Sequence, residues 1–183
     1  MRELSLHLLD ILENAREAGA TEILVEIRED SARDELVIRV VDDGRGIPNE
    51  VLQRVFDPFF TTRQTRHVGL GLPLLKAAAE RAGGSASVVS GCGCTEVTAR
   101  FQHSHIDRAP LGDVAGSLIA ALLGRRGPRL RYSHWVNGKS FTLDSDEVSE
   151  ALGGIDLGHP SVGRWLQTLV GEEIRSLRVG MAP

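Results

Sequence analysis

The sequence contains few cysteines and no long apolar run, and both absences limit what the chain can be. Its two cysteines, Cys92 and Cys94, are too few for a disulfide framework, and their spacing disfavours a bridge between them. No run of about eighteen apolar residues occurs, so we expect no membrane-spanning helix and no membrane partner. The first residues lack the apolar core and cleavage site of a secretion signal, which predicts a cytoplasmic location.

Strong net charge is also absent from this chain of 183 residues. The formal net charge is -4, so no broad positive field exists to attract nucleic acid, and we expect no nucleic-acid partner. The basic segment 125–131 is a local exception, with a solvated turn and a contact to an anionic partner as its two interpretations. The length predicts one full domain and a small appendage.

Apolar periodicity predicts a chain that mixes helices and strands. Helical spacing covers 3–18, and Gly19 follows where a helix-ending glycine is expected. The other expected elements up to residue 107 are strands over 21–28, 36–41, 85–89 and 95–101, a short helix over 49–55 capped by Asn49, and a helix over 70–82. Beyond residue 107 we expect a helix over 112–123, a hairpin over 130–143 turned by Asn137-Gly138, a short helix over 146–152 and a last helix capped by Ser161.

Three segments carry residues suited to chemistry. Asp10 and Asn14 lie four apart on the first helix, so they share a face and offer oxygen atoms to Mg²⁺; a solvated helix face is the alternative. The turn 42–46 supplies an aspartate that can accept from an exocyclic amine, and two glycines that let the backbone approach a ligand. The segment 68–72 opens a helix with Gly-x-Gly, which presents N–H donors to phosphate.

Together with the aromatic segment 56–62, which lies between the second and the third of them, these segments resemble in their order the four boxes of the GHKL superfamily. This superfamily contains histidine kinases, MutL mismatch-repair ATPases, heat-shock chaperone ATPases and type II topoisomerases. Residues 12–21 look like the N box in its MutL-like wording, and residues 42–48 look like the G1 box. Residues 56–62, Phe-Asp-Pro-Phe-Phe-Thr-Thr, look like the F box of histidine kinases, and residues 69–72 look like the G2 box. Four boxes in order are much more specific than any one of them.

The resemblance implies a fold, a ligand and a role for each matching residue. The fold is the Bergerat ATP-binding fold in residues 1–107, an α+β two-layer sandwich of a mixed sheet with helices on one face. ATP and Mg²⁺ are the implied ligands. Asn14 would ligate Mg²⁺. At the base, Asp42 would accept from the adenine amino group, Thr95 would reach the adenine through a water, and Gly44 and Gly46 would line the base and ribose. At the phosphates, Gly69 and Gly71 would wrap the chain of phosphates, and Arg63 and Arg66 of the short lid would pair with phosphate oxygens.

Asp10 is the residue that bears on mechanism. Histidine kinases resembling this chain have Asn at this place and the hydrolytic enzymes of the superfamily have Glu. An Asp there could therefore act as a general base on water, or as an outer-sphere Mg²⁺ ligand. The N box begins close to Met1, so we expect no phospho-acceptor hairpin ahead of it.

Residues 108–183 lie outside the four boxes, and we interpret them as a small α+β docking or dimerisation module. Trp135 and Trp165 would form its core or its interface. The tail resembles the C-terminal extension of small stand-alone GHKL proteins encoded beside bacterial hydrogenase or NADH-oxidoreductase genes. That resemblance implies a protein partner from a redox or hydrogenase system, and a homodimer is also open. Cys92 and Cys94 could hold a metal with His103 or His105, sense oxidation, or simply form a hairpin.

Three classes of function remain open at this stage. The chain could be a kinase that transfers phosphate to a separate protein, an ATP hydrolase that uses Asp10, or a nucleotide-responsive binding module with negligible turnover. Positioning and Mg²⁺ dominate phosphoryl transfer, so the site residues alone do not separate the classes. The F-box wording favours the kinase.

Overall fold

The computed structural model describes residues 3–58, 70–91, 93–122, 127–153, 157 and 159–179. In these residues the helices and strands are, in chain order, α1 (Leu4–Glu17), β1 (Glu22–Asp30), β2 (Glu35–Asp42), α2 (Asn49–Leu52), α3 (Gly71–Arg81), β3 (Ser85–Gly91), β4 (Cys94–Gln102), α4 (Val114–Leu122), β5 (Arg129–Val136), β6 (Lys139–Asp144), α5 (Ser145–Ala151) and α6 (Pro160–Leu177).

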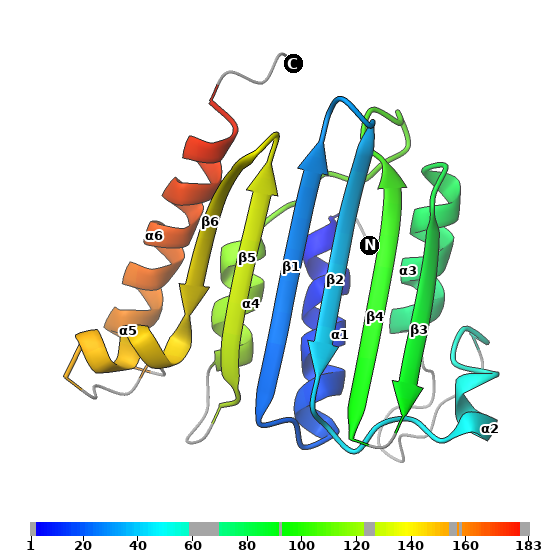
Figure 1. Cartoon of the computed structure of the whole chain (residues 1–183), viewed down its shortest axis with the longest axis horizontal. Coiled ribbons are helices and arrows are strands. Elements are labelled where there is room, and N and C mark those ends of the chain that lie inside the picture. Colours follow the sequence, from blue (N-terminus) through cyan, green and yellow to red (C-terminus); the bar gives the residue numbers. More distant parts are fainter. Residues whose placement is uncertain are drawn as a thin grey trace.

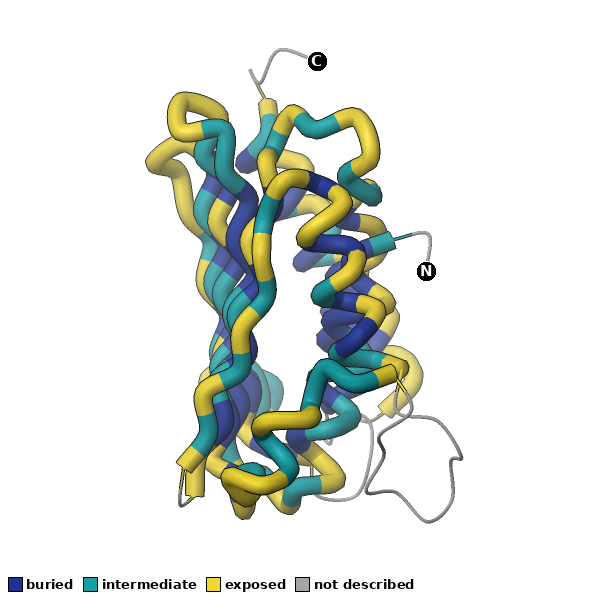
Figure 2. The backbone as a smooth tube through the Cα atoms, turned by 90° about the vertical axis from the view of Figure 1, so that its right-hand side faces the viewer, coloured by how far each residue is buried: buried dark blue, intermediate teal, exposed yellow. Residues whose placement is uncertain are grey.

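The strands form one mixed sheet in the order β3-β4-β2-β1-β5-β6. The β1–β5 pair is parallel and the other neighbouring pairs are antiparallel. Helices α1, α3 and α4 lie behind the sheet in Figure 1, and Figure 2 shows the sheet and the helices as two layers. The predicted α+β two-layer sandwich is therefore confirmed.

The core lies between these two layers. Apolar side chains of α1 recur every three or four residues and are at most 5% exposed: Leu4, Leu8, Ile11, Leu12 and Ala15. They pack into one hydrophobic cluster with alternating strand residues such as Val25 and Val40. Burying a side chain of this size stabilises the fold by about 1.5–3 kcal/mol, so the cluster fixes where α1 and its polar residues lie on the sheet.

The C-terminal segment extends the same sheet. Strand β5 pairs with β1 from Glu22 opposite Arg129 to Glu29 opposite Val136. Helix α4 packs against α1, α6 packs against α4, and their apolar residues belong to the same hydrophobic cluster as α1. The predicted boundary at residue 107 stays a prediction, because a shared sheet and core do not show whether either part folds alone.

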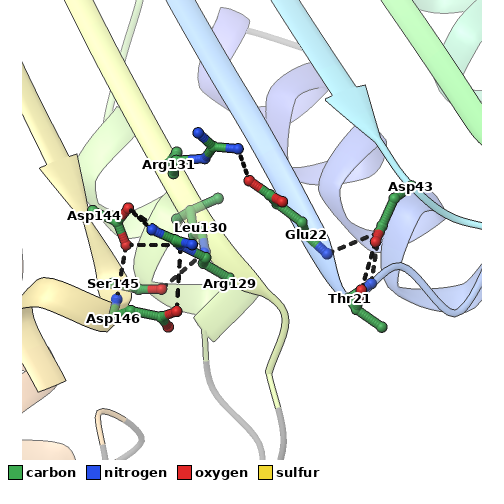
Figure 3. Close-up of polar contacts among 9 residues, drawn as sticks. All are labelled: Thr21, Glu22, Asp43, Arg129, Leu130, Arg131, Asp144, Ser145 and Asp146. Atoms are coloured by element: carbon green, nitrogen blue, oxygen red, sulfur yellow. Dashed lines mark hydrogen bonds and ion pairs between the residues drawn. The ribbon is translucent and has the colours of Figure 1, made fainter.

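Ion pairs join the start of β5 to the start of β1, to the end of β6 and to α5 (Figure 3). Arg131 of the basic segment pairs with Glu22 of β1. Arg129 pairs with Asp144 at 2.6 Å and with Asp146 at 3.3 Å. These two arginines therefore serve the chain's own carboxylates, while residues 125 and 126 of the segment lie outside the described residues.

Two predicted helix caps differ in the structure. The last helix begins at Pro160, and its N-cap is His159, whose ring accepts from the Ser161 N–H. Proline fits the first helical turn because its missing N–H is not needed there, so the helix starts earlier than a serine cap predicts. Likewise, α2 follows Pro48 and ends at Leu52, without a side-chain cap from Asn49. Within the part of the chain described, no helix combines the length and hydrophobicity needed to cross a bilayer.

A buried polar network links the end of α6 to the sheet. Glu29 of β1, only 6% exposed, lies 2.7 Å from His134 Nε2 of β5 and accepts a 2.7 Å hydrogen bond from Arg178. Tyr132 O–H lies 2.6 Å from His134 Nδ1. Burial alone would raise the pKa of Glu29, but the hydrogen bonds from His134 and Arg178 outweigh burial and lower the pKa to about 2. The ionised carboxylate is thus a structural part of the fold.

We expect Glu29→Gln to lower the free energy of unfolding by about 3 kcal/mol at neutral pH, because it breaks a buried, hydrogen-bonded ion pair. The folded pKa is depressed, so this stabilisation is present above the ordinary value of 4.5 and is lost as the pH falls towards about 2. Urea unfolding of both proteins from pH 7 to pH 2.5 measures the difference. Glu35→Gln is the control, since the Glu35–Arg100 pair is exposed and should contribute less than about 1 kcal/mol. Equal stability of the Glu29→Gln variant and the parent at pH 7 would contradict the assignment.

Candidate functional site

Asp42 is the last residue of β2 and points to the side of the sheet that carries the helices. It is 6% exposed, and its Oδ1 accepts a 3.0 Å hydrogen bond from the Gly44 N–H. Burial raises the pKa of Asp42, the Gly44 hydrogen bond opposes that rise, and the charge of Asp43 adds to it. A buried carboxylate with acceptor capacity left over is suited to a ligand amine.

The neighbouring Asp43 has a different task. Its Oδ1 accepts from the Thr21 N–H at 2.7 Å and from the Glu22 N–H at 2.8 Å, and its Oδ2 accepts from the Thr21 hydroxyl (Figure 3). Asp43 therefore holds the start of β1 and is already committed to these donors. The structure separates two adjacent aspartates into one that faces the site and one that supports the turn.

Both glycines of the G1 turn lie where a side chain has no room. A Cβ on Gly44 would lie 2.7 Å from Ala18 Cβ and 2.8 Å from Asp42 Oδ1, so a larger residue would displace the carboxylate. Gly46 has a positive φ of 74°, and a Cβ there would lie 2.2 Å from the Gly91 carbonyl oxygen. The turn thus sits closely between the end of α1 and the β3–β4 hairpin.

Thr95 lies directly opposite Asp42 in the antiparallel β2–β4 register, and on the same face. It is 6% exposed, and its Oγ1 is 3.1 Å from the Ser90 Oγ of β3. Ser90 lies opposite Thr95 in the next strand pair. Asp42, Thr95 and Ser90 therefore form a polar row across β2, β4 and β3. The sequence reasoning missed Ser90, which it treated as part of the loop between the strands.

Asp10 and Gly71 lie side by side where α1 passes the first turn of α3. A Cβ on Gly71 would lie 3.3 Å from both Cβ and Oδ2 of Asp10. The first N–H groups of any α-helix have no partner within the helix, and together with the positive end of the helix dipole they favour phosphate. Asp10 and Asn14 are both half-buried on α1, one helical turn apart. Their oxygen atoms fit the hard-ligand preference of Mg²⁺.

Several predicted site residues lie outside the described residues. Arg63, Arg66 and Gly69 are among them. Their proposed contacts with phosphate stay predictions. The phosphate end of the site therefore rests on Asp10, Asn14 and Gly71.

Among the described residues, Cys94 does not gather with His103 or His105 into the zinc site that the sequence left open. Cys94 is exposed at the start of β4, whereas His103 follows the end of that strand, nine residues and about 30 Å away at a strand rise of about 3.3 Å per residue. His105 lies beyond His103, so neither histidine can meet Cys94. Cys92 lies outside the described residues.

A groove of about 590 Å³ lies on the opposite, uncovered face of the sheet. Its four arginines already face carboxylates within 3.6 Å: Arg28 with Glu26, Arg33 with Asp30, Arg39 with Glu26 and Glu96, and Arg100 with Glu35. A nucleotide phosphate would have to compete with these pairs. The geometry therefore favours the helix side, where Asp42 and the start of α3 offer groups with remaining hydrogen-bonding capacity.

At the lower end of the sheet in Figure 1, the molecule brings together an acceptor row suited to an amine-bearing base and a helix N-terminus suited to phosphate. These are the parts of a nucleotide site in an α+β two-layer sandwich. The sequence profile described as "Histidine kinase-, DNA gyrase B-, and HSP90-like ATPase" matches residues 2–105, which is more than half of the chain. The chain belongs to this family and carries a histidine-kinase-like ATP-binding module.

Similar curated proteins include several bacterial sensor kinases. The chain is 31% identical over 88 residues to the sensor protein KdpD of Clostridium acetobutylicum, covering 45% of this chain and 10% of that protein. It is 36% identical over 67 residues to the sensor protein kinase PilS of Pseudomonas aeruginosa, covering 37% and 12%. It is 40% identical over 68 residues to the sensor histidine kinase ZraS of Salmonella typhi, covering 37% and 14%. The matched region is thus a small part of each relative.

Proposed function

We propose that the chain is a Mg²⁺-dependent ATP-binding protein of histidine-kinase-like type that transfers the γ-phosphoryl group to a separate protein. In the transfer, the bond from the γ-phosphorus to the β–γ bridging oxygen breaks, a bond to the acceptor side chain forms, and ADP leaves. The observation that carries the proposal is the joint placement of the Asp42–Thr95 pair and the Asp10–Gly71 contact on the helix side of the sheet. The sensor-kinase names of the relatives support the kinase over other members of the family.

Each described residue has a task in this proposal. Asp42 accepts from the adenine amine, Gly44 and Gly46 admit the base and ribose, and the α3 N–H groups at Gly71 hold phosphate oxygens. Asn14 would hold Mg²⁺, which when bound neutralises charge on the phosphates. His7 on α1 is 3% exposed, and burial lowers its pKa to about 4, so it is not available as a phospho-acceptor. This supports an acceptor outside α1.

A second candidate is ATP hydrolysis with Asp10 as general base. The specific observation in its favour is that the Asp10 carboxylate lies against the first turn of α3, where the phosphates are proposed to bind. A base must reach the attacking water directly, so this position fits the role. A cytoplasmic location, a homodimer and a redox or hydrogenase partner stay predictions.

The proposal is tested by incubating the purified chain with γ-labelled ATP and Mg²⁺, with and without cell lysate. We expect label on a protein other than this chain, and no such label when Asp42→Asn replaces the parent. Release of free phosphate without protein labelling would favour the hydrolase instead. If neither protein labelling nor phosphate release is detected, both enzyme classes are contradicted and a binding module is favoured.

Asn14→Ala should weaken ATP binding in Mg²⁺ and leave binding in EDTA nearly unchanged, if Asn14 is a metal ligand. Loss of one charge-assisted contact predicts a decrease of about tenfold. Calorimetry in the two buffers measures both affinities. Asn14→Asp keeps an oxygen ligand and is the control that should retain the Mg²⁺ effect. Equal losses for Asn14→Ala in Mg²⁺ and EDTA would show a packing defect in α1 and refute the ligand role.

A further inference from the structure

Ser90 sits at the end of the polar row and has every hydrogen-bonding position of its hydroxyl in use. Its Oγ accepts from the Ile47 N–H at 2.8 Å, which ties the G1 turn to the β3–β4 hairpin. It donates to the Cys94 carbonyl oxygen at 2.9 Å. The Thr95 Oγ1 is the third neighbour, at 3.1 Å.

These contacts fix which hydroxyl gives its proton to the other. A serine hydroxyl has one proton and two lone pairs, an amide N–H can only donate, and a carbonyl oxygen can only accept. The single Ser90 proton is used on the Cys94 carbonyl, and one lone pair is used on the Ile47 N–H. The bond between the two hydroxyls therefore runs from Thr95 to Ser90, so the Thr95 proton points away from Asp42.

The direction of that bond sets what Thr95 offers to a ligand. With its proton on Ser90, Thr95 has only lone pairs left, and the ionised Asp42 opposite it also has only lone pairs. A water held between two acceptors gives both protons to them and likewise presents lone pairs to the base. Adenine carries an amine donor at its sixth position, whereas guanine carries a carbonyl acceptor there. The row thus matches adenine and opposes guanine.

We infer that Ser90 is a specificity-determining positioning residue: by accepting the Thr95 proton, it makes the polar row select an amine-bearing purine over a carbonyl-bearing one. Ser90 acts through Thr95 and does not itself need to touch the base. The inference rests on the proposed nucleotide site and adds to it the origin of base selectivity.

The test compares the affinities for ADP and GDP, both with Mg²⁺, by calorimetry or by competition with a fluorescent ADP analogue. The parent should prefer ADP. In Ser90→Ala the Thr95 hydroxyl is free to face the base as a donor and no longer only as an acceptor. The ratio of ADP to GDP affinity should therefore fall about five- to tenfold, which corresponds to the free energy of about one hydrogen bond. Ser90→Thr keeps the hydroxyl and should keep the ratio. Ser87→Ala, three residues before Ser90 and exposed on the other face of β3, is the matched control and should change neither affinity.

A structural role and a selectivity role give different results. If Ser90 only anchors the G1 turn, Ser90→Ala weakens ADP and GDP binding equally and the ratio is unchanged, which overturns the inference. Thr95→Val provides an independent variant, because it removes the hydroxyl on which Ser90 acts. We expect it to lower the ratio too, and we expect Ser90→Ala to cause no further fall in the ratio when added to it. A further fall would show that Ser90 does not act through Thr95. Failure of the parent to bind either nucleotide would instead overturn the proposed function itself.

Discussion

Asp10→Asn should lower ATP hydrolysis by about 10²–10⁴-fold while leaving the affinity for ATP nearly unchanged, if Asp10 is a general base. The Asp10 carboxylate lies beside Gly71: a Cβ placed on Gly71 would be 3.3 Å from Asp10 Oδ2. Gly71 is at the start of α3, where the phosphates are proposed to bind. Asparagine has nearly the same shape but cannot take a proton from water. The loss should therefore appear in turnover and not in binding.

The kinase proposal predicts a different outcome for the same variant. Resembling histidine kinases have Asn at this place, so Asp10→Asn should preserve or improve any transfer to a partner protein. Phosphate release at saturating ATP, measured beside a binding isotherm, separates the two. Glu80→Gln, an exposed carboxylate near the other end of α3, is the control and should change neither quantity. Nonzero turnover that is the same in Asp10→Asn and the parent would remove Asp10 from the mechanism.

Asp42→Asn should lower ATP affinity by about five- to 150-fold without unfolding the protein. The asparagine oxygen can still accept from the Gly44 N–H, as Asp42 Oδ1 does at 3.0 Å. Its amide NH₂ group would then face the adenine amine, donor against donor. Leaving a buried donor without an acceptor costs about 1–3 kcal/mol, which corresponds to about five- to 150-fold in affinity.

The same substitution should not destabilise the ligand-free protein. Burial raises the folded pKa of Asp42 above its ordinary value of 3.8, so the folded protein binds this proton more tightly than the unfolded chain does. The contribution of Asp42 to stability is therefore greatest at acid pH and is lost as the pH rises through the folded pKa. Relative to the parent, Asp42→Asn should gain stability as the pH rises from about 4 to 7, which thermal unfolding at each pH measures.

Asp43→Asn is the matched control for this prediction. It weakens the cap on the Thr21 and Glu22 N–H groups, so it should cost stability while leaving the base contact in place. The two neighbouring substitutions should thus have opposite effects on stability and binding. If Asp43→Asn abolished ATP binding and Asp42→Asn did not, the adenine contact would have been assigned to the wrong aspartate.

Local sequence patterns were sufficient to predict most elements around the site. The stripe that includes Leu8 and Leu12 predicted α1, and the alternation through Val25 predicted β1, because each reflects burial of one face against the same core. The order of the motifs predicted that Asp42, and not Asp43, contacts the adenine. The structure gives a physical reason for this choice, because only Asp42 lies on the buried face of β2. Periodicity alone could not have made that choice, because both residues follow the same apolar run.

Ser90 was missed, although the sequence contained a signal for it. The predicted strand ended at Val89, while β3 continues to Gly91, which pairs with Cys94 around a tight turn where Gly93 has a positive φ of 77°. In this antiparallel hairpin, the residue before Gly91 lies opposite the residue after Cys94, so Ser90 lies opposite Thr95. A tight hairpin through a glycine could therefore have indicated the pair.

Long-range pairing was beyond local patterns. The alternation over 130–136 predicted a strand, but nothing local specifies that β5 joins β1 in parallel across a hundred residues. Trp165 was expected in a core or an interface, and its place is not in the core: the side chain is 48% exposed on α6. The buried face of α6 is carried by Leu166 and Val170 instead. An aromatic next to an apolar stripe does not reveal which side of the stripe is covered.

The central claim is that the nucleotide binds on the helix side of the sheet and not in the groove on the open face. A ¹H–¹⁵N NMR titration of the chain with ADP and Mg²⁺ tests it most directly, because backbone amides on both faces report in one experiment. We predict saturable shifts at Gly44, Gly46, Gly71 and Thr95, with Arg28 and Trp135 of the groove unchanged. Shifts confined to Arg28, Trp135 and their neighbours, with the four site amides unchanged, would contradict the account.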